Sequence, residues 1–388
     1  MLIKKLKVTG LLSFGPSGME LPLNNLNVLI GPNGSGKSNF LEVLALVKAA
    51  PTNLPAPVKE MGGVREWLWK GSGAVDEATI EVILDYPRAR RYPLRHGLSV
   101  ADHGGRFEVV DEWIENEKPH PPHDEPLFYY RFQRGNPVLK DMQARERQLR
   151  RENVKPEQSV LSQFRDPEHY PVLDWLQGQY EQIRLFRNWS MGPAAPLRRE
   201  QSTHGRGDFL TDGGENLALV LSKIRSRVKS DMLASLNKLY EGIEDIQLTI
   251  DGGNVLLFLE EKGGREIPAT RLSDGTLRYL CLLAILLHPE PPPLIALEEP
   301  ELGLHPDVIP HIAELLMRAS ARTQLVVTTH SRMLVDALSQ DPSSVVVCHK
   351  EEGESRFERL DPAALALWLE KYSLGELWSM GELGGNRW

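Results

Sequence analysis

The chain has 388 residues, enough to bury a sizeable core and to form two or three lobes. Its hydrophobic content of 41% and charged content of 25% are those of an ordinary globular protein, and a net charge of −8 argues against a surface that binds nucleic acid everywhere. No stretch approaches the ~20 apolar residues of a membrane span, and no signal-peptide pattern opens the chain, so we expect a cytoplasmic protein without membrane contact. Cys281 and Cys348 lie in apolar segments, which argues against a disulfide framework.

The N-terminal third has the pattern of a β-rich region. One helix is expected in this region, over 40–48. A polar, proline-rich stretch carries His120, His123 and Asp124, and we interpret it as an exposed loop rather than a metal site because no second ligand cluster is evident. The strands are expected at 2–8, 19–23, 26–30, 78–86, 107–113 and 127–132.

The middle of the chain changes to helical spacing. A run of charged residues predicts a polar helix over 140–151, and a short strand is expected at 183–186. Further helices are expected at 170–184, 217–227 and 232–240. A hairpin, a helix over 273–288 and buried strands at 293–297 and 325–329 then restore an α/β pattern. The predicted organisation is an N-terminal lobe (1–139), a mainly helical insertion (140–242) and a C-terminal lobe (243–388).

The strand expected at 26–30 leads directly into a glycine-rich loop and then a helix, which is the context of a phosphate loop. Its glycines let backbone amides face a β-phosphate, and the helix N-terminus favours the same anion. Lys37 is expected to reach the β- and γ-phosphate oxygens, and Ser38 to ligate Mg²⁺. The nucleotide-binding residues predicted here are Gly31, Pro32, Asn33, Gly34, Ser35, Gly36, Lys37, Ser38 and Asn39.

Two glutamates follow the apolar strand expected at 293–297. We assign Glu298 to Mg²⁺, through water, and Glu299 to the orientation or deprotonation of an attacking water. The pair could instead be solvated or cap the helix beginning near Pro306. His330 ends the next strand, where it can donate to a γ-phosphate and report its presence, although a lone histidine is more often a core or cap residue.

These segments, in this order, resemble the motifs of the ABC ATPase superfamily. Residues 31–38 resemble Walker A, Leu-Ser-Asp-Gly-Thr at 272–276 the signature, 294–299 Walker B, and 328–330 the switch histidine. The opening Leu-Lys-Val-Thr-Gly-Leu-Leu-Ser-Phe and the segment Glu-Glu-Pro-Glu-Leu-Gly-Leu-His-Pro look like the RecF, SMC and OLD-type branch. The resemblance implies an α/β fold: an ABC-type P-loop ATPase head with a mixed or parallel core sheet, an antiparallel β elaboration and an inserted, mainly helical lobe.

The resemblance also implies a homodimer that encloses ATP and Mg²⁺. Ser273 and the amide of Gly275 in one copy would contact the γ-phosphate held by Lys37 of the other. From the residues alone, Ser273 could equally be an ordinary N-cap. The family's glutamine-loop metal ligand is assigned to Gln163, with Gln133 as the alternative. The sequence departs from the usual motifs at Asp274 (Gly), Glu298 (Asp) and His305 (Asp).

The interval between Lys37 and Ser273 shows no sustained heptads, so the resemblance points to a compact RecF- or OLD-like head rather than an SMC arm. The segment after His330 is too short for the fused TOPRIM nuclease of OLD-type proteins, so a nuclease would be a separate chain. Basic and aromatic residues of the insertion and of the segment just before it suggest DNA contact, but acidic residues dilute them. They are Arg131, Arg134, Arg145, Arg147, Arg150, Arg151, Arg165, Arg184, Arg187, Arg198, Arg199, Arg206, Tyr129, Tyr130, Phe132 and Trp189.

The function predicted from these features is an ATP-hydrolysing switch that dimerises on ATP. It would act in DNA repair or anti-phage defence by controlling DNA or a separate effector such as a nuclease. Two alternatives stay open. One is the ATPase subunit of a membrane transporter, and the other is a non-hydrolysing scaffold in which ATP only fixes a dimer.

Overall fold

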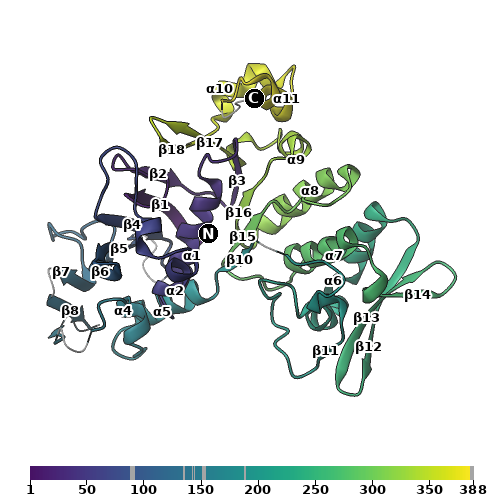
Figure 1. Cartoon of the computed structure of the whole chain (residues 1–388), viewed down its shortest axis with the longest axis horizontal. Helices are drawn as coiled ribbons and strands as arrows, with labels where there is room; N and C mark the ends of the chain where they lie inside the picture. The colour runs from purple at the N-terminus through teal and green to yellow at the C-terminus, as the bar shows by residue number, and fades with distance from the viewer. Residues whose placement is uncertain are drawn as a thin grey trace. The chain divides into compact units, whose positions relative to one another are not determined.

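The computed structural model describes residues 1–87, 92–133, 136–141, 143, 145–150, 154–187 and 189–384. It is a mixed α/β protein with several sheets, which confirms the expected fold class (Figure 1). The chain forms two compact units. Unit 1 contains Met1–Ile183, Val346–Leu360 and the last residues from Leu383, and unit 2 contains Arg184–Val345 and Asp361–Glu382. The first boundary between the two units therefore falls after Ile183. The segments expected from the sequence were 1–139, 140–242 and 243–388.

Unit 1 is built on an antiparallel sheet with the strand order β2-β1-β4-β5-β6-β7-β8-β9. The strands expected in this region are confirmed, but β5 was not anticipated because Arg95, His96 and Gly97 interrupt its apolar pattern. Gly97 pairs with Trp113 across the sheet, and a Cβ on Gly97 would lie 2.0 Å from the Trp113 ring. The strands are β1 (Ile3–Thr9), β2 (Met19–Pro22), β4 (Glu77–Leu84), β5 (Leu94–His103), β6 (Arg106–Asn116), β7 (Phe128–Gln133), β8 (Asn136–Lys140) and β9 (Glu146–Gln148).

The prediction of a polar helix over 140–151 is wrong. Strands β8 and β9 pair antiparallel there, and Asp141 forms the turn between them. Its carboxylate accepts the backbone N–H groups of Gln143 and Arg145, both at 2.9 Å, and pairs with the Arg145 guanidinium. An aspartate that accepts backbone donors two and four residues ahead favours a turn over a helix interior. Residues 142, 144 and 151–153 lie outside the described part of the chain.

The phosphate-loop segment of unit 1 lies between a buried strand and a helix, as predicted. Every residue of β3 (Leu26–Ile30) is buried, and β3 lies beside β17 (Val345–Glu351), which pairs antiparallel with β18 (Glu354–Arg359). The next helix is mainly buried, so the loop between β3 and this helix has both ends fixed. The helices of unit 1 are α1 (Lys37–Ala49), α2 (Pro55–Glu60), α3 (Val64–Trp67), α4 (Val160–Gln163) and α5 (Pro171–Glu181).

Unit 2 contains three parallel neighbouring strands, β10 (Arg184–Phe186), β15 (Leu294–Glu298) and β16 (Gln324–Thr328). Their carboxyl ends coincide, because Phe186 is opposite Leu297 and Glu298 is opposite Thr328. The helices of unit 2 are α6 (Leu217–Leu239), α7 (Asp274–Leu286), α8 (Ile309–Ser320), α9 (Arg332–Ala337), α10 (Pro362–Leu369) and α11 (Leu374–Met380). The two helices expected at 217–227 and 232–240 are one helix, α6, since no helix breaker separates them.

A second sheet in unit 2 packs against α6, which also contacts α7 (Figure 1). Its strands are β11 (Gln201–Ser202), β12 (Ile243–Asp251), β13 (Asn254–Glu261) and β14 (Arg265–Pro268). Strands β11, β12 and β14 each pair antiparallel with β13. This sheet includes the predicted hairpin. Within the described ranges, no helix has the length and apolar character needed to cross a membrane.

Candidate nucleotide-binding site

The side chain of Lys37, the first residue of α1, turns back toward the loop that precedes this helix. This side chain is 6% exposed, and its ammonium donates to the carbonyl oxygens of Gly31 at 2.7 Å and Pro32 at 3.0 Å. A buried ammonium needs acceptors or anions around it. The carbonyls of the loop supply the first of these, and the arrangement places a positive charge at the start of α1.

The glycines of the loop are needed for its shape. Gly31 has a φ of 147°, and a Cβ there would lie 2.1 Å from the carbonyl oxygen of Cys348. Gly36, with a φ of 102°, is the N-cap of α1 and provides no side-chain cap. The hydroxyl of Ser35 is buried and has no hydrogen-bond partner among the described residues. Uncapped amides at a helix start and a buried polar atom without a partner fit an anion such as a phosphate.

We expect Gly31→Ala to lower the free energy of unfolding by about 1–3 kcal/mol, because the added methyl overlaps a backbone carbonyl that cannot move aside. Chemical denaturation measures this change. Gly178→Ala is the matched control: a Cβ at this position of α5 meets nothing within 4 Å, so the variant should gain about 0.5–1 kcal/mol. Equal stability of the two variants would contradict the packing argument.

The other residues of the loop differ in their surroundings. Asn33, Gly34 and Ser38 are exposed, and Ser38 lies in the first turn of α1. The Asn39 amide donates to the Ser13 hydroxyl at 2.7 Å, so it stabilises the segment before β2. A nucleotide contact for Asn39 stays a prediction.

In unit 2, Glu299 and His330 lie close together at the ends of β15 and β16. The Nε2 atom of His330 is 3.7 Å from Oε1 of Glu299. Glu299 has a φ of 44°, a left-handed conformation that costs about 1–3 kcal/mol for a residue other than glycine. Its backbone N–H donates to the carbonyl and the hydroxyl of Thr328, at 3.0 and 3.2 Å. These two hydrogen bonds hold the backbone of Glu299 in its strained conformation. Strained residues that are held in this way are commonly found at functional sites.

Glu298 has an ion-pair partner that sequence analysis did not identify. Nε of Arg187, the residue after β10, donates to Oε2 of Glu298 at 2.9 Å. The parallel pairing of β10 with β15 brings them together. A metal ion bound by Glu298 would therefore share its carboxylate with Arg187 or displace it.

Glu301 is a second residue that sequence analysis missed. One of its carboxylate oxygens accepts from the Thr329 hydroxyl and from the His330 backbone N–H at 3.2 Å. Burial raises the pKa of this carboxyl, and its other oxygen has no partner among the described residues. The segment Glu-Glu-Pro-Glu contained the signal, because a third acid two residues after the pair lies within reach of the same strand ends.

The raised pKa of Glu301 predicts a pH dependence of stability. Its folded state holds the proton more tightly than the unfolded chain, so the stability of the protein falls as pH rises from the ordinary glutamate pKa to the raised one. Glu301→Gln removes this titration and keeps an oxygen for Thr329 and His330. We expect the Tm of the variant, relative to the parent protein, to increase from about pH 4 to pH 7. A constant Tm difference in scanning calorimetry would contradict the assignment.

Arg278 connects the signature helix α7 to the loop after β15. Its Nη1 donates to the carbonyl oxygen of Leu302 at 2.6 Å and lies 3.5 Å from that of Glu299. The guanidinium also lies 5.3 Å from the centre of the Trp189 ring. Partial burial lowers the pKa of Arg278, which still leaves it charged.

Ser273 is the N-cap of α7, because its hydroxyl accepts the backbone N–H of Thr276 at 3.0 Å. Gly275 follows in the first turn, where a Cβ would lie 3.0 Å from the carbonyl oxygen of Gly303. The capping interpretation of Ser273 is thus confirmed, and its contact with a phosphate stays a prediction.

Gln163 takes part in a local network. Its amide accepts the Lys155 backbone N–H at 2.6 Å and donates to the carbonyl of Gln158 at 3.1 Å and that of Ser159 at 3.3 Å. Metal ligation by Gln163 would require these bonds to open. The side chain of the alternative, Gln133, lies outside the described part of the structure.

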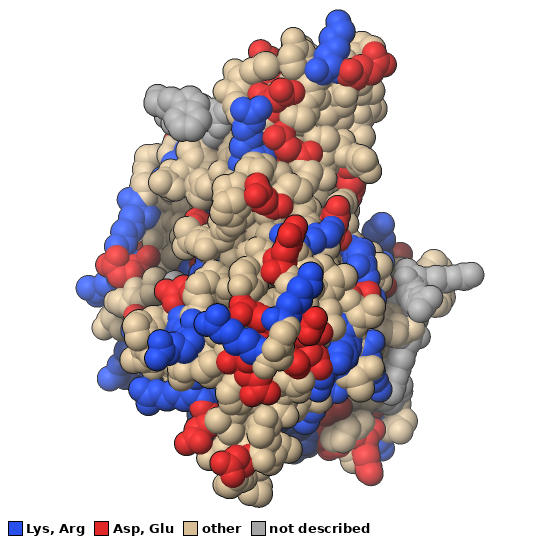
Figure 2. All heavy atoms as spheres, turned by 90° about the vertical axis from the view of Figure 1, so that its right-hand side faces the viewer, with Lys and Arg blue, Asp and Glu red and all other residues tan. Residues whose placement is uncertain are grey.

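Many of the basic and aromatic residues considered for DNA contact have partners in the fold. Arg131 pairs with Glu115 at 3.0 Å and Arg165 with Glu181 at 3.1 Å. Tyr130 and Phe132 are buried, so their rings cannot stack on bases. Arg134 and Arg151 lie outside the described residues. On the face shown in Figure 2, basic and acidic side chains are interspersed.

The fold is similar to that of SMC head domains, with a phosphate-loop segment between β3 and α1. Residues 26–336 match the family described as "AAA domain, putative AbiEii toxin, Type IV TA system", and the chain belongs to this family. No curated protein matches the sequence.

Similar solved structures are SMC head domains. The Smc head bound to the C-winged helix domain of ScpA has 14% identity and a TM-score of 0.58, with 95% of this chain and 100% of that chain covered. The Smc head with an extended coiled coil, bound to the C-terminal domain of ScpA derived from Pyrococcus furiosus, has 14% identity and a TM-score of 0.55, covering 96% and 99%. The Smc head with a coiled coil and joint from Pyrococcus yayanosii has 12% identity and a TM-score of 0.51, covering 96% and 99%.

Proposed function

We propose that the chain binds and hydrolyses ATP, dimerises when ATP is bound, and acts as a switch on a separate effector or on DNA. The main support is the loop before α1, where a buried lysine, an uncapped helix start and an unpartnered serine hydroxyl fit a triphosphate. The membership of an AAA family and the SMC-head fold agree with this proposal.

In this proposal each motif has one role. Lys37 and the loop amides bind the β- and γ-phosphates, and Ser38 and Glu298 hold Mg²⁺, which neutralises phosphate charge when bound. Glu299 orients or deprotonates the attacking water, and His330 donates to the γ-phosphate. Glu301 would fix the position of His330, since it accepts the backbone N–H of that residue.

The remaining contacts would come from a second copy. Ser273 and Gly275 at the start of α7 present a hydroxyl and a helix N-terminus, which suit the γ-phosphate bound by the partner's phosphate loop. Light scattering with and without Mg-ATP tests this proposal. We expect a mass twice that of the monomer only with ATP, together with phosphate release, and a monomer at saturating ATP would overturn the dimer.

The family description favours anti-phage defence over DNA repair, because it refers to a toxin–antitoxin system. We propose that the effector is a separate protein chain whose activity follows the nucleotide state. Purification from the native host with the neighbouring genes intact tests this part. A companion protein that is released or retained according to ATP would support it. Purification without any companion would count against effector control, and DNA-stimulated hydrolysis would then favour DNA.

The alternatives have less support. Neither the family match nor the SMC-head structures favour a transporter subunit. The close approach of His330 to Glu299 favours hydrolysis over a scaffold that only binds ATP, because a histidine near a carboxylate at two strand ends suits the chemistry of a γ-phosphate.

A further inference from the structure

The signature segment contains an aspartate where ABC ATPases usually have glycine. Asp274 is the first residue of α7 and follows the N-cap Ser273. A carboxylate favours a helix N-terminus, but it repels an anion bound at the same place. If Ser273 and Gly275 contact a γ-phosphate, the charge of Asp274 must be compensated.

Arg198 supplies this compensation. Its guanidinium, in a residue that is 6% exposed, forms an ion pair with the Asp274 carboxylate through Nη2. Nη1 donates to the carbonyl oxygens of Leu272 at 2.6 Å and Ala269 at 3.2 Å, both in the four residues before the signature serine. One side chain therefore fixes both the backbone before Ser273 and the carboxylate after it.

Arg198 is itself held by its own segment. Nε donates to the carbonyl of Met191 at 2.9 Å and approaches that of Gly192 at 3.2 Å, so all three guanidinium nitrogens have acceptors. A short 3-10 helix, η3 (Pro196–Arg198), carries the residue.

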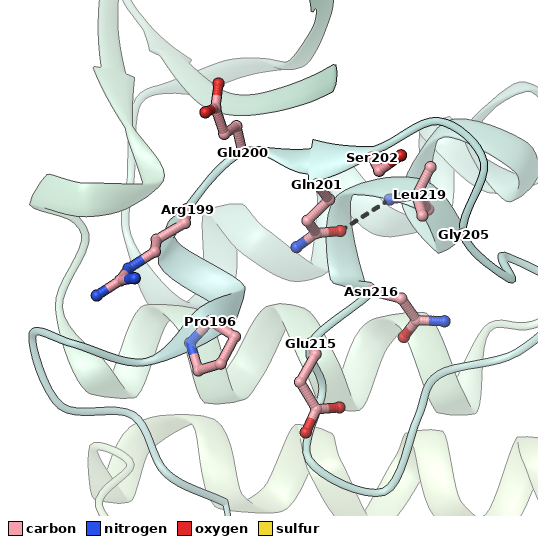
Figure 3. A pocket seen from close by; sticks show the side chains of 9 residues that line it. All are labelled: Pro196, Arg199, Glu200, Gln201, Ser202, Gly205, Glu215, Asn216 and Leu219. Carbon is pink, nitrogen blue, oxygen red and sulfur yellow. Dashed lines mark hydrogen bonds between the residues drawn. The ribbon is translucent and has the colours of Figure 1, made fainter. Parts of the chain in front are cut away.

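The chain after Arg198 is fixed to the start of α6. The side-chain oxygen of Gln201 accepts the backbone N–H of Leu219 at 3.2 Å, as the dashed line in Figure 3 shows. A pocket of about 330 Å³ lies beside this contact, and the exposed Arg199 lines it. Because α6 also packs on α7, the same helix contacts both the segment after Arg198 and the signature helix.

We propose that Arg198 is a positioning residue for the signature loop: it holds the backbone before Ser273 and neutralises Asp274, so that a partner copy's γ-phosphate can bind at the start of α7. This inference rests on the proposed function. Arg198 would act on ATP-driven dimerisation and not on ATP binding by the monomer, since the phosphate loop belongs to unit 1.

The test compares Arg198→Met, Asp274→Gly and the double variant, each in a Glu299→Gln background to slow hydrolysis. We expect Arg198→Met to weaken ATP-driven dimerisation about tenfold or more, the loss of one charged hydrogen-bonded pair, with monomer affinity for ATP unchanged. Asp274→Gly alone should dimerise nearly as the parent does, and the double variant should recover part of the loss, because the unpaired carboxylate is gone. A double variant no better than Arg198→Met would overturn the electrostatic role.

Two further variants keep the result decisive. Arg199→Met is the matched control, because it removes the same charge from the adjacent exposed residue, and it should dimerise as the parent does. Arg198→Lys keeps the charge with fewer donors and should lie between the parent and Arg198→Met, which covers the case in which Arg198→Met fails to fold. If the parent dimerises with ATP and both Arg198→Lys and Arg198→Met dimerise as well as the parent does, this inference alone fails. If the parent stays monomeric with ATP, the proposed function itself fails.

Mixed subunits provide a second readout. For this experiment both variants keep Glu299, and Arg198→Met protein has an intact phosphate loop while Lys37→Met protein has an intact signature loop. A mixture should therefore hydrolyse ATP faster than the sum of the two alone, because one composite site per mixed dimer is complete. A mixture equal to the sum would overturn a role of Arg198 in trans.

Discussion

Glu299→Gln should lower ATP hydrolysis by about 10²–10⁴-fold, leave ATP binding intact and let the ATP-bound dimer accumulate. The substitution keeps the size of the side chain, and the backbone bonds from Glu299 to Thr328 do not depend on the carboxylate. An amide cannot take a proton from water, so only the chemical step should suffer. Phosphate release under single-turnover conditions, with light scattering of the same sample, measures both effects.

Glu370→Gln is the control for this experiment. It makes the same change at an exposed residue at the end of α10, also in unit 2, and should hydrolyse ATP as the parent does. Unchanged turnover in Glu299→Gln would show that the catalytic assignment is wrong. Loss of ATP binding would instead mean that Glu299 acts on the affinity for nucleotide rather than on the chemical step.

The strands, the phosphate loop and the strand-end acids could be predicted because their signals are local. A buried strand, a glycine loop and a helix lie within one short segment, and β15 and β16 each end in polar residues. Glu299 and His330 come from neighbouring parallel strands, so their approach follows from the pattern itself.

The arginines of unit 2 could not be placed in the same way. Arg187 and Arg198 were counted among the candidates for DNA contact, yet each forms an ion pair with an acid 111 or 76 residues away in sequence. Arg278 likewise donates to a carbonyl 24 residues away. A guanidinium acquires its partners from tertiary contacts, and composition does not distinguish a buried donor from a solvated one.

The prediction of a polar helix over 140–151 was wrong for a related reason. Charge runs carry no information on backbone geometry, and Asp141 forms its turn by accepting backbone donors. Similarly, β5 was missed because Gly97 is covered by the Trp113 ring from the neighbouring strand, a contact visible only once the strands pair.

Lys37→Met should weaken ATP affinity by about 10²-fold, because it removes a charged donor worth about 3 kcal/mol to a bound triphosphate. The same change should lower the free energy of unfolding by about 1–3 kcal/mol, since the carbonyls of Gly31 and Pro32 lose the donor that they accept in the protein. Equilibrium binding of a fluorescent ATP analogue and urea denaturation measure the two effects separately.

The matched control is Lys59→Met, which removes the same charge from an exposed position at the end of α2 in the same unit. It should change neither ATP affinity nor stability appreciably, because an exposed lysine contributes little to either. If both variants bind ATP equally well, the loop before α1 does not hold the triphosphate. If Lys37→Met loses affinity without losing stability, its ammonium acts on nucleotide alone, and the bonds to the loop carbonyls contribute nothing to the fold.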